Sequence, residues 1–138
     1  FNARNRNCCK QKLNLAIEPN LPAMVCDPFS LERILVELLT NACKFSPPEE
    51  DIIVDVKMKS ENILFQVINT GVEIHKSELP RIFEKIYRIH SNDPWKQGGT
   101  GLGLALVQKL TKHLGGVITV ESGLLRTCFS VELPVESE

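Results

Sequence analysis

The chain lacks the strong charge and the long apolar runs that would indicate a nucleic-acid or membrane partner. Its 16 basic and 17 acidic residues give a formal net charge of −1, so polyanions are not generally attracted. No apolar run approaches the roughly 20 residues of a membrane-spanning helix, and no signal-peptide pattern is visible. With 43% hydrophobic residues, the composition is typical of a globular protein.

The chain also lacks the cysteine spacing of a metal site or a disulfide framework. The five cysteines form no C-x-x-C pair and have no histidine nearby at zinc-site spacing. We therefore expect small, buried thiols in a reducing, cytoplasmic setting. The length of 138 residues suits one domain, assigned to residues 10–138, after a linker remnant at residues 1–9. Because the first residue is Phe1 rather than Met, we interpret the chain as a fragment.

Hydrophobic periodicity predicts strands grouped apart from helices. Asp27 and Pro28 resemble a helix cap and first turn, and Pro47 would stop that helix. The expected strands are 10–17, 52–59, 63–68, 117–121 and 127–133, with a short one at 24–26. The expected helices are 28–46, 78–83 and 104–113. This grouping favours an α+β fold with helices packed on one face of a mixed sheet.

Glycine is scarce, yet four of the eight glycines lie within residues 98–103. This run opens directly into the helix expected at 104–113. Glycine allows close approach of the backbone to a ligand, and a helix N-terminus attracts phosphate. The sequence therefore indicates nucleotide binding. Neither the dinucleotide fingerprint nor the P-loop fits, because the spacing is G-x-G-x-G and no Gly-Lys-Ser or Gly-Lys-Thr follows.

A second candidate group lies on the first long helix. Glu37, Asn41 and Lys44 recur at i, i+4 and i+7, so they share one face. A carboxylate can act as a base, an amide oxygen suits Mg²⁺, and a lysine suits phosphate. A solvated polar face would show the same spacing, so the pattern alone leaves both interpretations open.

Three segments together resemble the sequence boxes of sensor histidine kinases. Leu38–Ser46 resembles their asparagine box, Leu79–Arg88 their phenylalanine box, and Gly99–Ala105 their second glycine box. The order is colinear, and the resemblance extends from about Lys10 to Pro134. It implies the two-layer Bergerat ATP-binding fold, with a mixed, mostly antiparallel sheet and three helices on one face.

The resemblance also implies roles for individual residues. Glu37 would help to activate an acceptor histidine, and Asn41 would bind Mg²⁺. Residues 89–99 would form a lid over ATP. The other expected nucleotide contacts are Lys44, Asn69, Gly71, Tyr87, Arg88, Gly99, Thr100, Gly101, Leu102, Gly103, Leu104 and Thr127.

The implied function is that of a Mg-ATP-binding catalytic domain in a two-component system. The acceptor histidine would lie on a separate upstream dimerisation domain that this chain does not contain, and the phosphoryl group would pass to a response regulator receiver domain. The full-length protein would be a homodimer, cytoplasmic or anchored to a membrane. The alternative is a degenerate, pseudokinase-like domain that acts through protein contacts. An ATPase or chaperone of the same superfamily fits less well, because the phenylalanine box favours the kinases.

Two glycine boxes depart from the family pattern. Asn69 stands where an aspartate accepts a hydrogen bond from the adenine amine, which predicts weaker ATP binding and poorer rejection of GTP. Glu73 replaces a glycine, so we expect backbone strain or an obstructed pocket if that position has a positive φ or lies against the base. Leu124–Thr127 stands in place of Gly-x-Gly-Thr and keeps only the threonine.

Overall fold

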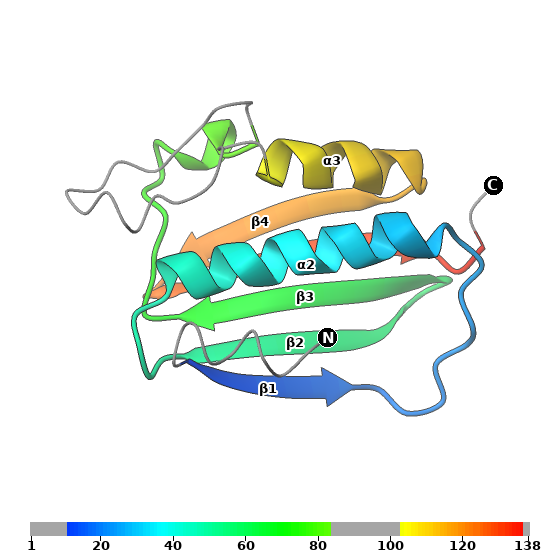
Figure 1. Cartoon of the computed structure of the whole chain (residues 1–138), viewed down its shortest axis with the longest axis horizontal. Coiled ribbons are helices and arrows are strands. Elements are labelled where there is room, and N and C mark those ends of the chain that lie inside the picture. The colour runs from blue at the N-terminus through cyan, green and yellow to red at the C-terminus, as the bar shows by residue number, and fades with distance from the viewer. Residues whose placement is uncertain (1–10, 84–102, 137–138) are drawn as a thin grey trace.

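One five-stranded sheet, covered on one face by two α-helices, makes up the part of the chain that the computed structural model describes, residues 11–83 and 103–136 (Figure 1). The elements are β1 (Lys12–Ile17), α2 (Pro28–Phe45), β2 (Asp51–Lys59), β3 (Asn62–Thr70), the 3₁₀ helix η1 (Leu79–Arg81), α3 (Gly103–His113), β4 (Val117–Gly123) and β5 (Arg126–Pro134). The strand order is β1-β2-β3-β5-β4, and only β1 and β2 run parallel. The predicted α+β class with a mostly antiparallel sheet is confirmed.

The expectation of three helices is not confirmed, because the described residues contain two α-helices. In place of the helix expected at 78–83, a single 3₁₀ turn spans Leu79–Arg81. Pro80 lacks an N–H to continue a helical ladder, and the N–H of Arg81 donates to the carbonyl of Glu78 (2.9 Å). The strand expected at 24–26 is a single bridge between Val25 and Glu136. Neither α-helix is long and apolar enough to cross a membrane.

Helix α2 begins and ends where the sequence predicts. The Asp27 carboxylate accepts hydrogen bonds from the Ser30 hydroxyl (2.8 Å) and the Phe29 N–H (3.1 Å), and these bonds lower the pKa of Asp27. The last turn closes through the Ser46 N–H, which donates to the Ala42 carbonyl (3.0 Å). Pro47 then prevents continuation. The chain therefore places the polar residues of α2 at defined positions along a capped helix.

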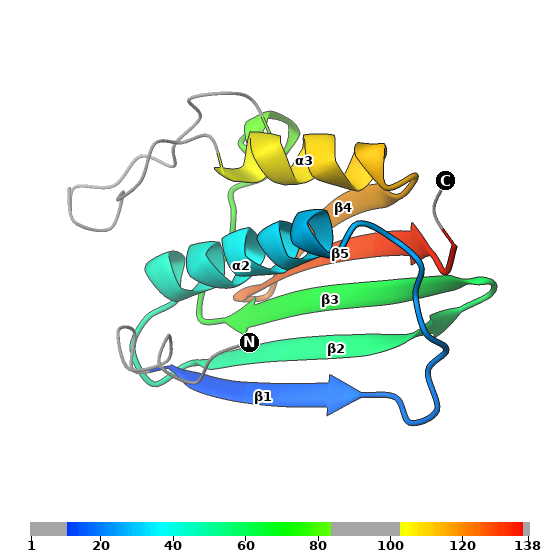
Figure 2. The ribbon, with the colours of Figure 1, turned by 45° about the vertical axis from the view of Figure 1, so that its right-hand side comes forward.

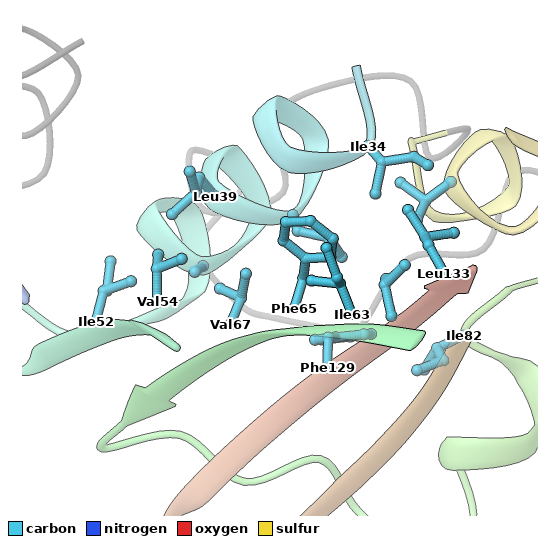
Figure 3. Close-up of a cluster of buried hydrophobic side chains, with 14 of the residues drawn as sticks. Ile34, Leu39, Ile52, Val54, Ile63, Phe65, Val67, Ile82, Phe129 and Leu133 are labelled. Carbon is cyan, nitrogen blue, oxygen red and sulfur yellow. The ribbon is translucent and has the colours of Figure 1, made fainter. Parts of the chain in front are cut away.

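The core lies between α2 and the sheet. Ile34 and Leu38 of α2 are 0% and 1% exposed, and they face the central strands β3 and β5. Figure 3 places Phe65 and Val67 of β3 beneath this helix. Figure 2 places α3 beside α2 over the same face. Two adjacent helices on one layer of strands leave the polar flank of α2 directed toward the start of α3.

The turn between β4 and β5 places two consecutive non-glycine residues in the left-handed backbone region. Leu124 and Leu125 both have positive φ, 54° and 55°. This arrangement is typical of a type I′ hairpin turn, which strongly prefers Asn-Gly. Leu124 is 99% exposed and Leu125 is 65% exposed, so packing does not explain either leucine.

Replacing Leu125 by glycine should therefore stabilise the fold. A side chain with a Cβ costs about 1–2 kcal/mol in the left-handed region, so Leu125→Gly should raise the free energy of unfolding by about 1 kcal/mol in urea titrations. Leu125→Ala is the matched control, because it removes the apolar side chain and keeps the Cβ. Equal stabilities for the two variants would contradict a backbone origin of the strain.

Candidate nucleotide site

The polar face of α2 contributes the first part of the candidate site. Glu37 and Asn41 are half-buried and Lys44 is exposed near the C-terminal end of the helix. The Glu37 carboxylate pairs with the guanidinium of Arg33 one turn earlier, with 2.9 Å between Oε1 and Nη2. The predicted common face of these residues is thus flanked by a cation that motif reasoning did not identify. Its i, i+4 spacing to Glu37 was the available signal.

The first residue of α3 lies directly against Glu37. A Cβ added at Gly103 would stand 2.6 Å from Oε2 of Glu37. Such a contact is tighter than side chains permit, so glycine at this position gives the carboxylate its place beside the N-terminus of α3. Leu104 follows and packs against the core. The structure therefore joins Glu37 and Gly103, two residues that the sequence assigned to different motifs.

The second part of the candidate site is formed by Asn69 at the end of β3 and Thr127 at the start of β5. The two residues pair across β3 and β5 and are 4% and 2% exposed. The Thr127 hydroxyl donates to the Val72 carbonyl (3.1 Å) and lies 2.8 Å from the Ser122 hydroxyl oxygen, which accepts the Ile74 N–H (2.7 Å). This network anchors the loop after β3 to the last two strands. The threonine kept from the third glycine box is thus a structural anchor of that loop.

Asn69 differs from Thr127 in its side-chain contacts. The residue is 4% exposed, yet its side-chain amide makes no hydrogen bond with another residue in the ranges 11–83 and 103–136. Its neighbours in register, Ile52 on β2 and Thr127 on β5, place it on the helix-covered face of the sheet. An amide there offers both a donor and an acceptor to a ligand.

Gly71 lies two residues after Asn69, at a position where the backbone requires glycine. Its φ is +80°, and an added Cβ would stand 2.6 Å from Cγ of Glu50. The Glu50 carboxylate accepts the Thr70 hydroxyl proton (2.8 Å), and the Gly71 N–H donates to the Leu125 carbonyl (2.8 Å). Glu50 and Thr70 carry no motif in the sequence, and only the fold reveals that they support this turn.

The expected strain at Glu73 is not found. Glu73 does not have a positive φ, and its exposed carboxylate accepts the Leu125 N–H at 2.9 Å. The side chain therefore reaches the β4–β5 turn, where it is held outside the core. The glycine at this family position is replaced here by a residue that makes a specific hydrogen bond.

The remaining predicted contacts lie outside the described residues. They are Tyr87, Arg88, Gly99, Thr100, Gly101 and Leu102. In the part of the chain that the structure describes, no three His, Cys, Asp or Glu side chains gather into a cation site. The metal-binding role expected of Asn41 stays a prediction.

The chain is similar to known proteins along almost its whole length. The family described as "Histidine kinase-, DNA gyrase B-, and HSP90-like ATPase" matches residues 26–137. The circadian input-output histidine kinase CikA of Synechococcus elongatus is 34% identical over 126 residues, covering 91% of this chain and 17% of that protein. The sensor histidine kinase CusS of Escherichia coli O157:H7 is 37% identical over 110 residues, covering 78% of this chain and 22% of that protein. The chain thus spans about a fifth of the length of these relatives.

Solved structures share the fold. The mycobacterial sensor histidine kinase MprB superimposes with a TM-score of 0.83 at 24% identity, covering 98% of this chain and 91% of that one. Full-length ShkA, solved in complex with AMPPNP, gives a TM-score of 0.81 at 26% identity, covering 96% of this chain and 27% of that one. The arrangement of α2, α3 and the sheet is therefore common to this chain and to those domains.

The contact between Gly103 and Glu37 leads to a prediction. Gly103→Ala should push the Glu37 carboxylate aside, because the far end of a flexible side chain yields more easily than backbone. We expect the ¹³C chemical shift of the Glu37 carboxyl to change, with the free energy of unfolding altered by less than about 1 kcal/mol. The control is Gly123→Ala, where an added Cβ meets nothing within 4 Å. An unchanged Glu37 signal in Gly103→Ala would contradict the contact.

Proposed function

The chain belongs to the family of histidine kinase-, DNA gyrase B- and HSP90-like ATPases, and on this premise we propose that it is the Mg-ATP-binding catalytic domain of a two-component sensor histidine kinase. The observation that carries the proposal is the placement of Glu37 beside the N-terminus of α3 at Gly103, with Asn41 one turn further along the same flank of α2. The similarity to the histidine kinases CikA and CusS favours this branch of the family.

The residues present fit a nucleotide with its metal ion. The buried Asn69 amide has hydrogen-bonding capacity to offer a base, and the Asn41 amide oxygen suits Mg²⁺, which takes few protein ligands. Lys44 would attract phosphate as a point charge. Bound Mg-ATP supplies the γ-phosphoryl group, and the cation neutralises charge on the phosphates.

Glu37 would act on the acceptor histidine of a separate dimerisation domain. Its carboxylate is half-buried and held by Arg33, an arrangement in which it can accept the imidazole N–H proton and orient the ring toward the nucleotide. The phosphohistidine would then serve a response regulator receiver domain. In this proposal the full-length protein is a homodimer with its catalytic domain in the cytoplasm, and a membrane anchor would lie elsewhere in it.

The degenerate, pseudokinase-like alternative depended mainly on Glu73. The carboxylate of Glu73 bonds to the Leu125 N–H, and Asn41, Glu37 and Lys44 all retain the chemistry that the proposal requires. This geometry favours the nucleotide-binding interpretation over a domain that acts through protein contacts alone.

The first test is calorimetric titration with ATP and ADP, with and without Mg²⁺. We expect a dissociation constant in the range of roughly 1–100 μM that tightens with Mg²⁺. Asn41→Ala should abolish most of the Mg²⁺-dependent gain, because it removes the amide oxygen, and should leave metal-free binding nearly unchanged. Asn14→Ala on the exposed edge of β1 is the control. Absence of heat with wild-type chain at millimolar nucleotide would overturn the proposed function.

Asn69 should determine how well the site reads the base. Asn69→Asp exchanges a neutral acceptor for a charged one, which should tighten ATP binding several-fold, on the order of 1 kcal/mol. It should also reduce competition by GTP, since a carboxylate cannot donate to the guanine carbonyl. The readout is the ratio of ATP to GTP dissociation constants in competition titrations.

The control for this variant is Asn14→Asp, which adds the same charge on the exposed surface of β1. If the ratio of ATP to GTP dissociation constants is identical in wild type and Asn69→Asp, residue 69 does not read the base. This result would not bear on Mg²⁺ binding at Asn41.

A further inference from the structure

The outer edge of the sheet at β1 presents backbone groups that none of the described strands pairs with. The N–H groups of Lys12 and Glu18 donate to Glu50 and Val56 on the β2 side, at 3.0 and 2.8 Å. Because backbone groups of successive strand residues alternate in direction, Leu13, Leu15 and Ile17 direct their N–H and C=O groups away from β2. Among the described residues no strand pairs with this edge.

The side chains of β1 add apolar surface to that edge. Leu15 and Ile17 are each 59% exposed, and they lie on the same face as Leu13, which is in register with Ile52 of the core. Figure 1 places α2 over the centre of the sheet and leaves β1 at its rim. The strand contains no proline and its interior carries no charge, so it lacks two of the features that usually protect an edge from pairing.

We propose that this edge pairs with β1 of a second copy of the chain, in an antiparallel arrangement with the two-fold axis at Leu15. In that register Leu15 faces Leu15 of the second copy, and Leu13 faces Ile17. All three residues have outward backbone groups, so about six hydrogen bonds form between the strands. The proposal does not depend on the nucleotide site.

The charges at the two ends of β1, on Lys12 and on Glu18 directly after the strand, complement each other in this register. Lys12 lies opposite Glu18 of the second copy, and the symmetry repeats the pair. Glu18 uses Oε2 to accept the Met58 N–H (3.0 Å), which leaves Oε1 for the lysine. Opposite charges placed directly across two strands contribute favourably. A strand that begins with Lys12 and is followed by Glu18 is thus complementary to its own reversed copy.

A symmetric β1–β1 pair also closes at two copies, whereas a head-to-tail pairing of β1 with β4 does not. The second sheet edge is β4, and contact between β1 of one copy and β4 of the next would continue from copy to copy, as a ring or as an open filament. An isologous β1–β1 contact uses the same patch on both copies and stops at the dimer. The predicted species is therefore a dimer, and longer assemblies would count against the β1–β1 register.

Sedimentation equilibrium of the chain from roughly 10 μM to 1 mM tests the proposal. We expect a monomer–dimer equilibrium that Leu15→Lys abolishes, because two lysines would face each other at the symmetry axis. Lys12→Glu should weaken dimerisation about fivefold, and the double variant Lys12→Glu with Glu18→Lys should restore it. Lys109→Glu, an exposed site on α3, is the matched control.

Amide hydrogen exchange supplies a readout at single residues. At high concentration the amides of Leu13, Leu15 and Ile17 should become protected, while Lys12 and Glu18 are already bonded to β2 at any concentration. Circular dichroism checks that Leu15→Lys remains folded. A monomer across the whole range, assemblies larger than a dimer, or a dimer that Leu15→Lys leaves intact would overturn the proposal.

Discussion

The contact between the apolar stripe of α2 and the central strands fixes the rest of the structure. Ile34 and Leu38 are almost completely excluded from solvent, so α2 cannot rotate about its axis without exposing them. Glu37 and Asn41 each follow one of these residues by three positions, and their flank is therefore set by the core. The candidate chemistry of α2 is in this sense a consequence of packing: any change that shifts Ile34 or Leu38 would also move the carboxylate and the amide.

The features that sequence predicted well are local ones. The limits of α2 depend on Asp27, Pro28 and Pro47, whose effects reach only one turn of helix. The common face of Glu37 and Asn41 follows from helical periodicity alone. The failure at residues 78–83 has a local origin too, because apolar spacing does not distinguish a 3₁₀ turn from an α-helix when only one turn is present. The expectation for Glu73 failed for a different reason. The strain expected there depended on the φ angle of the residue, which the sequence pattern does not determine.

Contacts between distant segments could not be predicted, because they depend on topology. Alternation identifies β1 and β2 as strands, but it does not state that they run parallel, with α2 as the crossover between them. The same applies to Gly103 beside Glu37 and to Glu50 beneath Gly71. Each of these glycines belongs to a motif, yet the side chain that occupies the space above it comes from α2 or from the loop after it. The motifs identified the positions that need glycine. They did not identify the side chains, Glu37 and Glu50, that occupy the space next to each glycine.

The departures from the family pattern lie together in the structure, although they lie far apart in the sequence. Glu73 replaces a glycine of the first box and Leu125 falls in the altered third box, and the two meet through a hydrogen bond of 2.9 Å. The Gly71 N–H bonds to the carbonyl of the same leucine, so the loop after β3 and the β4–β5 turn are held by both backbone groups of one residue. A non-glycine turn with two positive φ angles persists where its surroundings over-determine it, and these two bonds supply that restraint. Glu73 and the β4–β5 turn thus stabilise each other close to Asn69. The flank of α2 that carries Glu37 and Asn41 takes no part in these contacts.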